Sequence, residues 1–516
     1  MLPVRLNKSI MRLALYCAGL FIILFILNNQ PVAVLHKQAL RYVPHEATDD
    51  VLTGISLKTC YFFSTCSLGP EWRMVPKQLD WNKDTGKKWS FFTQQYLFVK
   101  SVPLTEIMGN DAVTKLTVKP DGSVVHEIEK FDPNRSNRFY YGLDVIFSSP
   151  IDPRHDWTIH ATPISGIQGN VPVFITTKNS PGADQNGQPS LRVKDDGKFK
   201  ILQVADLHFS SFEGICRDQF PEVPNCKADS RTLTFVNKVL DIEKPDLVVL
   251  TGDQIFGEDS FDSITTTLKY VQPFIERRIP YAITFGNHDD EGSMSREELM
   301  AFMKTLPFNV ASEGPSDIDG VGNYILHVFS NNGPLINLYM LDSHKYSLSP
   351  KIPGYDWVKE NQLEWLKKNK PDAPTGDVNP INMAFFHIPL PEYRNVQGGI
   401  VGNAKEGITA PKYNTGTRDV LQSLGISVVS VGHDHCNDYC TMDVKDGSQD
   451  DKIWLCYGGG SGEGGYGGYG GTTRRLRVFE MSTNEGVVKS WKRLETTPDE
   501  VFDVQTLVSG GKPIKE

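Results

Sequence analysis

The stretch 199–208, FKILQVADLH, is an apolar run that ends in Asp206 and His208, two side chains that can bind a metal ion. Similar runs precede polar side chains further along the chain. These are 247–250 before Asp253, 281–285 before Asn287 and His288, 382–386 before His387, and 426–431 before His433 and His435. Short apolar runs of this length are typical of buried strands. Because open α/β sheets place their sites at the carboxyl ends of strands, we expect these clusters to converge.

Helical patterns separate several of these strands. They cover 230–243, about 261–277, a helix that begins near Ser295 with a capping box to Glu298, and 358–368. Further strands are predicted at 324–328 and 336–341, with a terminal antiparallel pair at 473–481 and 487–493. This alternation predicts a largely parallel, buried sheet with helices on its faces.

The chain before this region has a different pattern. Short β-type runs at 111–118, 123–128, 157–162 and 171–176 predict a small β-rich domain over 51–177. A segment rich in Gly, Pro, Asn and Asp predicts a linker at 178–198. The main domain is then expected at 199–496, followed by a tail at 497–516.

The first 30 residues predict a cytosolic stub and a signal anchor. Arg5, Lys8 and Arg12 precede the uncharged apolar run 13–27, and no further basic residue occurs before Lys37. A cleaved signal peptide and a buried helix are the alternatives. The basic flank should stay cytosolic, which places the stalk at 31–50 and the catalytic domain in the lumen. We therefore expect a single-pass protein of a secretory-pathway or vacuolar membrane.

Seven of the eight cysteines follow the apolar run, and an odd number leaves at least one thiol free or paired between chains. Close spacing suggests Cys60–Cys66 and Cys216–Cys226 bridges, with Cys440–Cys456 or Cys436–Cys440 as a third. Buried unpaired thiols are the alternative. Asn134 begins a glycosylation sequon, so a glycoprotein is expected. The net charge of -9 argues against a nucleic-acid partner.

The series D-x-H, G-D, G-N-H-D, H and G-H-x-H resembles that of the calcineurin-like metallophosphoesterases, a superfamily that includes the purple acid phosphatases. The segments VADLHFS, LTGDQIFG, TFGNHDDEG and GHDHCNDYC are similar in sequence to those of the fungal dose-dependent cell-cycle regulator phosphatases and their plant relatives. The resemblance covers about 199–495. It implies a four-layer α/β/β/α sandwich, here joined to a smaller N-terminal β-rich domain and a membrane anchor.

The resemblance also implies a site with two divalent or mixed-valent ions of Fe, Zn or Mn, bridged by Asp253. The remaining ligands would be Asp206, His208 and His435 for one metal, and Asn287, His387 and His433 for the other. A hydroxide held between the metals would attack phosphorus in line. The expected activity is that of a phosphomonoesterase acting on phosphoester substrates, possibly phosphoproteins. A phosphodiesterase or nuclease on the same fold and a non-catalytic membrane-tethered binding protein are the alternatives.

His288 is expected to be a general acid or a hydrogen-bond donor to a phosphate oxygen, with orientation of Asn287 as its competing role. Asp289, Asp290 and Asp434 are candidate partners of the ligands. Typical purple acid phosphatases carry a tyrosine ligand of ferric iron three residues after the bridging aspartate, where this chain has Phe256. Since phenylalanine cannot bind a metal, we expect a colourless enzyme with a labile divalent first metal.

The segment 458–471 is rich in glycine and contains G-x-G-x-x-G, but the strand that follows it argues against a dinucleotide site. A flexible loop near the metal site is expected instead. Arg474 and Arg475 are interpreted as a solvated charge run, with phosphate contacts as the alternative.

Overall fold

The structure is a computed structural model that describes residues 50–515 except 62–64, 85, 135–138, 182–188, 331–332, 372–379, 396–398, 446–450 and 469, together with 16, 19 and 20. The chain divides into two compact units, Met1–His45 and Glu46–Glu516. Apart from residues 16, 19, 20 and 50, the predicted anchor and stalk lie outside the described residues. Within the part that is described, no helix has the length and apolar character needed to span a membrane.

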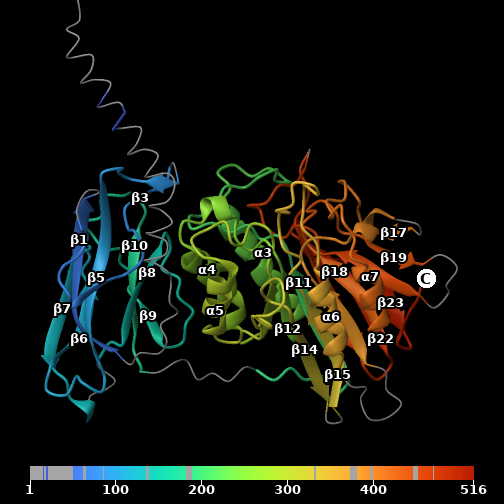
Figure 1. The fold of residues 1–516 in the computed structure, drawn as a ribbon, viewed down its shortest axis with the longest axis horizontal. Helices are drawn as coiled ribbons and strands as arrows, with labels where there is room; N and C mark the ends of the chain where they lie inside the picture. Colours follow the sequence, from blue (N-terminus) through green and yellow to red (C-terminus); the bar gives the residue numbers. More distant parts are fainter. Residues whose placement is uncertain are drawn as a thin grey trace, which may run out of the picture. The chain divides into compact units, whose positions relative to one another are not determined.

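Two seven-stranded sheets form the larger part of Glu46–Glu516 in the described ranges (Figure 1). The first has the order β13-β12-β11-β21-β22-β23-β24. Its strands are β11 Lys198–Val204, β12 Leu247–Thr251, β13 Tyr281–Thr284, β21 Arg475–Ser482, β22 Val487–Leu494, β23 Thr497–Ser509 and β24 Lys512–Pro513. β11, β12 and β13 are parallel, and the remaining pairs are antiparallel.

The second sheet has the order β14-β15-β16-β18-β20-β19-β17. Its strands are β14 Tyr324–Ser330, β15 Gly333–Met340, β16 Ile381–Phe385, β17 Ile400–Val401, β18 Ile426–Val431, β19 Cys440–Val444 and β20 Lys452–Tyr457. The four central strands β15, β16, β18 and β20 are parallel, whereas the outer strands pair antiparallel. The expectation of a largely parallel sheet therefore holds for the strands that carry the predicted site, and each sheet as a whole is mixed.

Helices connect and cover the strands. They are α3 Ala228–Glu243, α4 Ser263–Glu276, α5 Arg296–Lys304, α6 Glu360–Lys368 and α7 Thr417–Ser423, with short 3-10 turns η2 Gly257–Asp259 and η3 Pro391–Arg394. The predicted capping box of Ser295 and Glu298 is confirmed at the start of α5. α6 and α7 bury leucines against the second sheet in one apolar cluster, and Figure 1 shows both helices beside β18.

The two sheets are joined through the side chain of Gln203 on β11. Its amide nitrogen donates to the Thr251 hydroxyl at 3.0 Å and to the Val431 carbonyl at 3.1 Å, while its oxygen accepts from Ser430 at 2.6 Å. Strands β11 and β12 of the first sheet are thereby fixed against β18 of the second. Leaving a buried amide without these partners would cost free energy of folding. The contact therefore fixes how the strand ends of the two sheets meet.

The N-terminal region is β-rich, as predicted. Its strands are β1 Asp50–Tyr61, β2 Trp72–Met74, β3 Trp81–Asn82, β4 Lys87–Lys88, β5 Thr93–Pro103, β6 Asp111–Val118, β7 Val124–Lys130, β8 Gly142–Phe147, β9 Trp157–Ile159 and β10 Val173–Lys178. They form two three-stranded sheets and two hairpins around an apolar core. Trp81 stacks on Phe261 at 4.2 Å, and Lys77 lies 3.2 Å from Asp262, so the region packs against the start of α4.

The carboxyl-terminal residues differ from the expectation of a tail. Residues 497–509 form β23, which pairs with β22, and β24 follows it. The predicted terminal hairpin is present as β21 and β22. The first eight residues of β23 include no buried position, unlike those of β22. The hairpin gains a third and a fourth strand. These were not predicted, because the residues from 497 onward include exposed charged positions that resemble a tail.

Three disulfide bonds are present in the described residues: Cys60–Cys66, Cys216–Cys226 and Cys440–Cys456. The first two confirm the predicted local bridges. The third decides between the two alternatives, because β19 and β20 are antiparallel and place Cys440 directly opposite Cys456. Cys436 is a free, buried thiol, so the alternative Cys436–Cys440 bridge is wrong.

Candidate metal centre

The seven predicted metal ligands meet at one place in the fold. Each lies at or just after the carboxyl end of a parallel strand, on β11, β12 and β13 of one sheet and on β16 and β18 of the other. All seven are buried, with relative exposures between 0% and 7%. The structure thus brings together residues that the sequence spreads from Asp206 to His435, and their role as ligands remains a prediction.

The first cluster consists of Asp206, His208 and His435. The Nε2 atoms of the two histidines face each other at 3.1 Å, and His435 Nε2 lies 3.4 Å from Asp206 Oδ1. Two ring nitrogens and a carboxylate oxygen at these distances form a set of donor atoms that can bind one cation. This is the same set that the resemblance assigned to one metal.

The second cluster consists of Asp253, His387 and His433. His387 Nε2 lies 3.2 Å from Asp253 Oδ2 and 3.2 Å from His433 Nδ1. In each cluster the candidate ligand atoms lie within 4.8 Å of one another. The same Oδ2 atom of Asp253 is also 3.7 Å from His208 Nε2 of the first cluster. Asp253 therefore lies between the two clusters, in the position predicted for a bridging carboxylate.

Several atoms at the site fit a bound cation. Asn287 Oδ1, His208 Nδ1 and His433 Nε2 are buried and have no hydrogen-bond partner among the residues that the structure describes. His208 and His433 each direct their other ring nitrogen into a cluster, so Asn287 Oδ1 is the one of these three atoms that a cation in the site could satisfy. The donors are carboxylate, amide and imidazole with no thiolate, a set that suits Zn, Mn or Fe.

The backbone at the site is strained. Asp206, His208, Asp253 and His433 all have positive φ, at 56°, 49°, 53° and 78°. They account for four of the twelve such non-glycine residues in the described ranges. Left-handed backbone costs about 1–3 kcal/mol for each ordinary residue and gathers at functional sites. The strand ends thus bend sharply, which aims consecutive side chains at the same point.

Charge and burial set the protonation of the ligand groups. Burial lowers the pKa of His208 and of His433 well below the ordinary histidine value, so both rings are neutral and can bind a metal. Burial opposes the charged form of His387 too, but Asp253 raises its pKa to about 9. Burial also opposes ionisation of Asp253, yet His387 lowers its pKa well below the usual range. A metal ion would take the place of the proton on His387.

Contacts outside the ligand set hold the rings and loops in place. His387 Nδ1 donates to the Thr251 carbonyl at 2.9 Å, which turns Nε2 toward Asp253. His435 Nδ1 lies 2.9 Å from the Tyr466 carbonyl and does the same for its ring. Partners of this kind fix the tautomer and direction of a ligating histidine. The strand-end pattern alone gave no sign of these backbone acceptors.

Asp289 holds the loop of the central carboxylate. Its side chain is buried and accepts the backbone N–H groups of Asp253 at 2.9 Å, Ile255 at 3.0 Å and Gly286 at 2.7 Å. Burial and the nearby Asp253 raise its pKa to about 6. Of the three predicted acidic partners, Asp289 alone bonds the backbone of a candidate ligand. Asp290 pairs with Lys345, and Asp434 bonds Tyr457 and Thr409.

His288 lies beside the clusters with one edge open. Its ring centroid is 5.4 Å from that of His208, and its side chain is 28% exposed. Its Nδ1 is 2.5 Å from Glu291 Oε2, which leaves Nε2 toward other partners. Burial opposes the charged form, but Asp253 and Glu291 raise the pKa of His288. Its backbone N–H donates to Asp253 Oδ1 at 2.8 Å.

The glycine-rich segment 458–471 lies against the ligands, as expected, but residues 458–465 are buried and do not form an open loop. An added Cβ at Gly465 would lie 2.6 Å from His435 Cε1 and 2.9 Å from His208 Cδ2. The glycine is therefore needed for packing against the two histidines. The expectation of a flexible loop that admits substrate is wrong for this part of the segment.

Arg474 and Arg475 are not a solvated charge run, because both are buried. Arg474 donates to the carbonyls of Arg217 and Gly465 and lies 3.4 Å from Glu463. Arg475 donates to the Thr473 carbonyl and pairs with Asp438. The Arg474 guanidinium holds the glycine-rich segment in place through the Gly465 carbonyl. Because both guanidinium groups are buried against protein partners, the alternative role in phosphate contacts is not supported either.

Phe256 lies next to the first cluster, with its ring 5.7 Å from His208 and 5.8 Å from His288. The Arg217 guanidinium stacks over it at 4.3 Å and is half exposed. Three tyrosines also surround the site. Tyr466 stacks on His435 at 3.9 Å, Tyr355 meets His433 edge-on at 4.4 Å, and Tyr346 accepts a hydrogen bond from Asn287. The three tyrosines and Arg217 were not predicted from the sequence, because none belongs to a strand-end motif.

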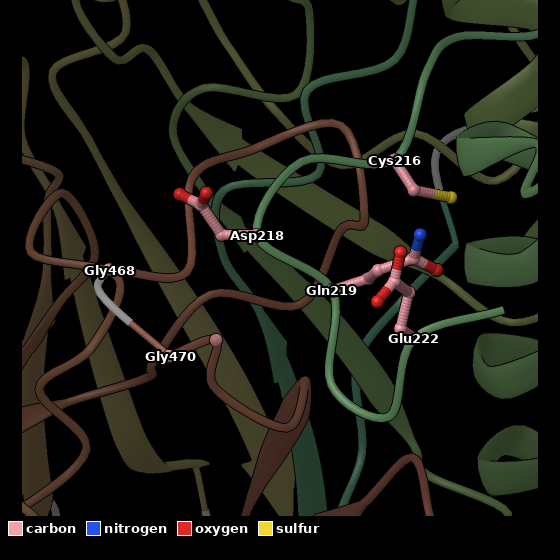
Figure 2. Close-up of a pocket in the computed structure, with 7 residues that line it drawn as sticks. Cys216, Asp218, Gln219, Glu222, Gly468 and Gly470 are labelled. Atoms are coloured by element: carbon pink, nitrogen blue, oxygen red, sulfur yellow. The ribbon is translucent and has the colours of Figure 1, made fainter.

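A cavity of about 630 Å³ lies beyond the glycine-rich segment and is lined by Cys216, Asp218, Gln219, Glu222, Gly468, Gly470 and Gly471. Figure 2 shows Gln219 and Glu222 on one loop facing Gly468 and Gly470 on another. None of the candidate ligands lines this cavity. The chemistry of the site is therefore assigned to the two clusters, and size alone gives the cavity no role.

Comparison with known proteins identifies the family of the chain. The model of the calcineurin-like phosphoesterase family matches residues 199–437. "Phosphatase DCR2" of Saccharomyces cerevisiae is 42% identical over 466 residues, which cover 83% of this chain and 80% of that protein. "Probable inactive purple acid phosphatase 28" of Arabidopsis thaliana is 35% identical over 347 residues, covering 61% of this chain and 85% of its own. Purple acid phosphatase PPD1 from yellow lupin seeds aligns over 91% of this chain and 94% of its own, with a TM-score of 0.39 and 11% identity. The chain belongs to the calcineurin-like phosphoesterase family, and the resemblance inferred from its motifs is confirmed.

The close packing of Gly465 predicts a loss of metal binding without any change of ligand. In Gly465→Ala the new methyl group pushes against His435 and His208, so we expect zinc affinity at the first cluster to fall roughly 10- to 100-fold. Zinc titration of the metal-free protein measures this. Gly407→Ala is the matched control, because an added Cβ there meets nothing within 4 Å. Equal zinc affinity in both variants would contradict the proposed packing role.

Proposed function

We propose that this chain is a metal-dependent phosphomonoesterase. The observation that carries the proposal is the position of Asp253 Oδ2, 3.2 Å from His387 in one cluster and 3.7 Å from His208 in the other. A carboxylate between two cation-binding clusters is the arrangement used by two-metal phosphoester hydrolases. Membership of the calcineurin-like phosphoesterases and the similarity to a yeast protein named as a phosphatase support it. The proposal covers small phosphate esters and phosphoproteins, since both present the same phosphoryl group.

Two divalent cations, when bound by these residues, would lower the pKa of a water molecule and neutralise charge on the phosphoryl oxygens. The protein supplies the rest. Asp253 Oδ1 accepts the backbone N–H of His288, so the ring of His288 stays beside the clusters. Glu291 holds Nδ1 of that ring, which directs Nε2 to the leaving-group oxygen. The raised pKa of His288 favours a protonated ring that can act as a general acid.

The non-catalytic alternative has some support from relatives, because one of them is named as a probable inactive purple acid phosphatase. In this chain, however, all seven candidate ligands and His288 are present and lie together. The diesterase or nuclease alternative rests on the shared family alone. The acidic net charge of -9 disfavours a polyanionic substrate.

Replacing the central carboxylate provides the main test. In Asp253→Asn the amide keeps an oxygen for the His288 N–H but loses the charge shared by both clusters. We expect loss of at least one bound metal and a fall of more than ~100-fold in hydrolysis of p-nitrophenyl phosphate. The wild-type protein should hydrolyse this monoester faster than bis(p-nitrophenyl) phosphate.

Asp317→Asn is the control for that substitution, since Asp317 is exposed and lies outside the site. Circular dichroism should show that both variants are folded. Unchanged hydrolysis in Asp253→Asn would refute the proposed mechanism. A wild-type preference for the diester would instead favour the diesterase alternative.

The phenylalanine beside the first cluster predicts the optical properties of the protein. Phe256 has no phenol oxygen to bind ferric iron, although its ring lies 5.7 Å from that of His208. We propose that the iron-loaded protein is colourless and that its first metal is a labile divalent ion. Visible absorption spectroscopy of metal-replete protein should show no tyrosinate-to-iron charge-transfer band, and the appearance of such a band in the wild type would overturn this assignment.

We also propose that residues 13–27 anchor the chain in a membrane with the catalytic domain in the lumen. The basic residues Arg5, Lys8 and Arg12 support this orientation. The three disulfide bonds support it too, because disulfides persist in oxidising compartments.

The membrane proposal predicts that the full-length protein stays with membranes in alkaline carbonate. In sealed vesicles it should resist added protease, and Asn134→Gln should remove a glycan that endoglycosidase removes from the wild type. Release into the carbonate supernatant together with protease digestion would contradict the proposed topology. Asn179→Gln is the glycosylation control, because Pro181 disrupts the sequon at that position.

A further inference from the structure

Tyr346 is a half-exposed aromatic residue that touches the metal centre. Its side chain is 45% exposed, yet its hydroxyl lies 3.2 Å from the buried amide nitrogen of Asn287. It belongs to the segment 345–356, which follows β15. Backbone hydrogen bonds from Asp356 to Lys345 and from Ser347 to Gly354 close this segment into a loop. The loop therefore fixes the position of Tyr346 relative to the site.

The hydroxyl of Tyr346 decides which end of the Asn287 amide is left without a hydrogen-bond partner. Asn287 Nδ2 donates to the hydroxyl, so Oδ1 points the other way. Oδ1 is buried and has no hydrogen-bond partner within the described ranges. An asparagine can bind a cation only through its oxygen, because the amide nitrogen carries two protons and no available lone pair. Without the hydrogen bond to Tyr346, no contact within the described ranges would fix which end of the Asn287 amide is the oxygen.

The ring of Tyr346 extends the site outward. It stacks on Tyr355 at 5.5 Å with an angle of 26°, and Tyr355 in turn meets the His433 ring edge-on at 4.4 Å. The two tyrosines are opposite each other in an antiparallel bridge. Tyr346 and Tyr355 thus form an aromatic step that begins at a candidate metal ligand and ends in solvent. A flat apolar group attached to a bound phosphoryl group could stack on this step.

We propose that Tyr346 has two roles, which rest on the proposed function: it positions the Asn287 oxygen for metal binding, and its ring receives an aromatic leaving group. The substrate class is then the aryl phosphate monoesters, ahead of alkyl esters. The two roles use different atoms of one side chain. Removing the hydroxyl alone should affect metal binding, whereas removing the ring should also affect recognition of the aryl group.

The first measurement is zinc titration of metal-free, full-length protein by calorimetry. We expect Tyr346→Phe to weaken one of two zinc-binding steps roughly 10- to 100-fold, as loss of a partner of a metal ligand does. Tyr413→Phe is the matched control, because Tyr413 is 41% exposed and packs on Trp357 away from the ligands. Wild-type zinc binding by Tyr346→Phe would overturn the positioning role.

The second measurement is binding of phenylphosphonate and ethylphosphonate to zinc-loaded protein at saturating zinc. These compounds carry a phosphoryl group but no ester bond, so the readout does not depend on turnover. We expect the wild type and Tyr346→Phe to prefer phenylphosphonate, and Tyr346→Leu to lose that preference by roughly fivefold. An unchanged preference in Tyr346→Leu with an unchanged melting temperature would overturn the ring role.

These readouts separate the inference from the proposed function. If the wild type hydrolyses no monoester but Tyr346→Phe binds zinc weakly, the proposed function fails and the positioning role stands. If the wild type hydrolyses monoesters and Tyr346→Phe binds zinc normally, the proposed function stands and the positioning role fails.

Discussion

The carboxylate of Asp253 lies between two groups of buried imidazoles, and the rest of the site is arranged around it. One oxygen accepts the backbone N–H of His288, and the other faces His387 and His208. The residue keeps this position because its backbone is left-handed and its own N–H is held by Asp289. The neighbouring Gly252 lets His387 approach closely, since a Cβ there would lie 2.2 Å from the ring. Moving this carboxylate would disturb both clusters at once.

The packing of two sheets makes that arrangement possible. A single parallel sheet brings its strand ends to one edge, but it cannot surround a cation pair from two sides. Here β11 and β12 supply Asp206 and Asp253 from one sheet, while β16 and β18 supply His387 and His433 from the other. Gln203, on β11 just before Asp206, joins the two sheets by hydrogen bonds. The candidate metal centre is therefore a property of the interface between the two sheets.

The sequence predicted the parts of the fold that depend on local pattern. The buried strands β11, β12, β13, β16 and β18 were predicted, together with four of the five helices α3 to α7 and the residues at the strand ends. Prediction failed where a residue's role depends on a distant partner. Arg474 and Arg475 looked solvated because their buried acceptors, including Glu463 and Asp438, cannot be recognised from spacing. Tyr346 was missed for the same reason, since it lies far from Asn287 in the chain.

One relative at 35% identity is named as a probable inactive purple acid phosphatase, and a shared fold does not by itself decide activity. The donors at the site are more informative. The buried Asn287 Oδ1 without a partner costs about 1–3 kcal/mol, and four left-handed residues add a similar cost each. A protein that only bound a partner at its surface would gain stability by losing these features. They are concentrated within one site, where a bound cation would satisfy Asn287 Oδ1, and this argues for a metal centre that the chain uses.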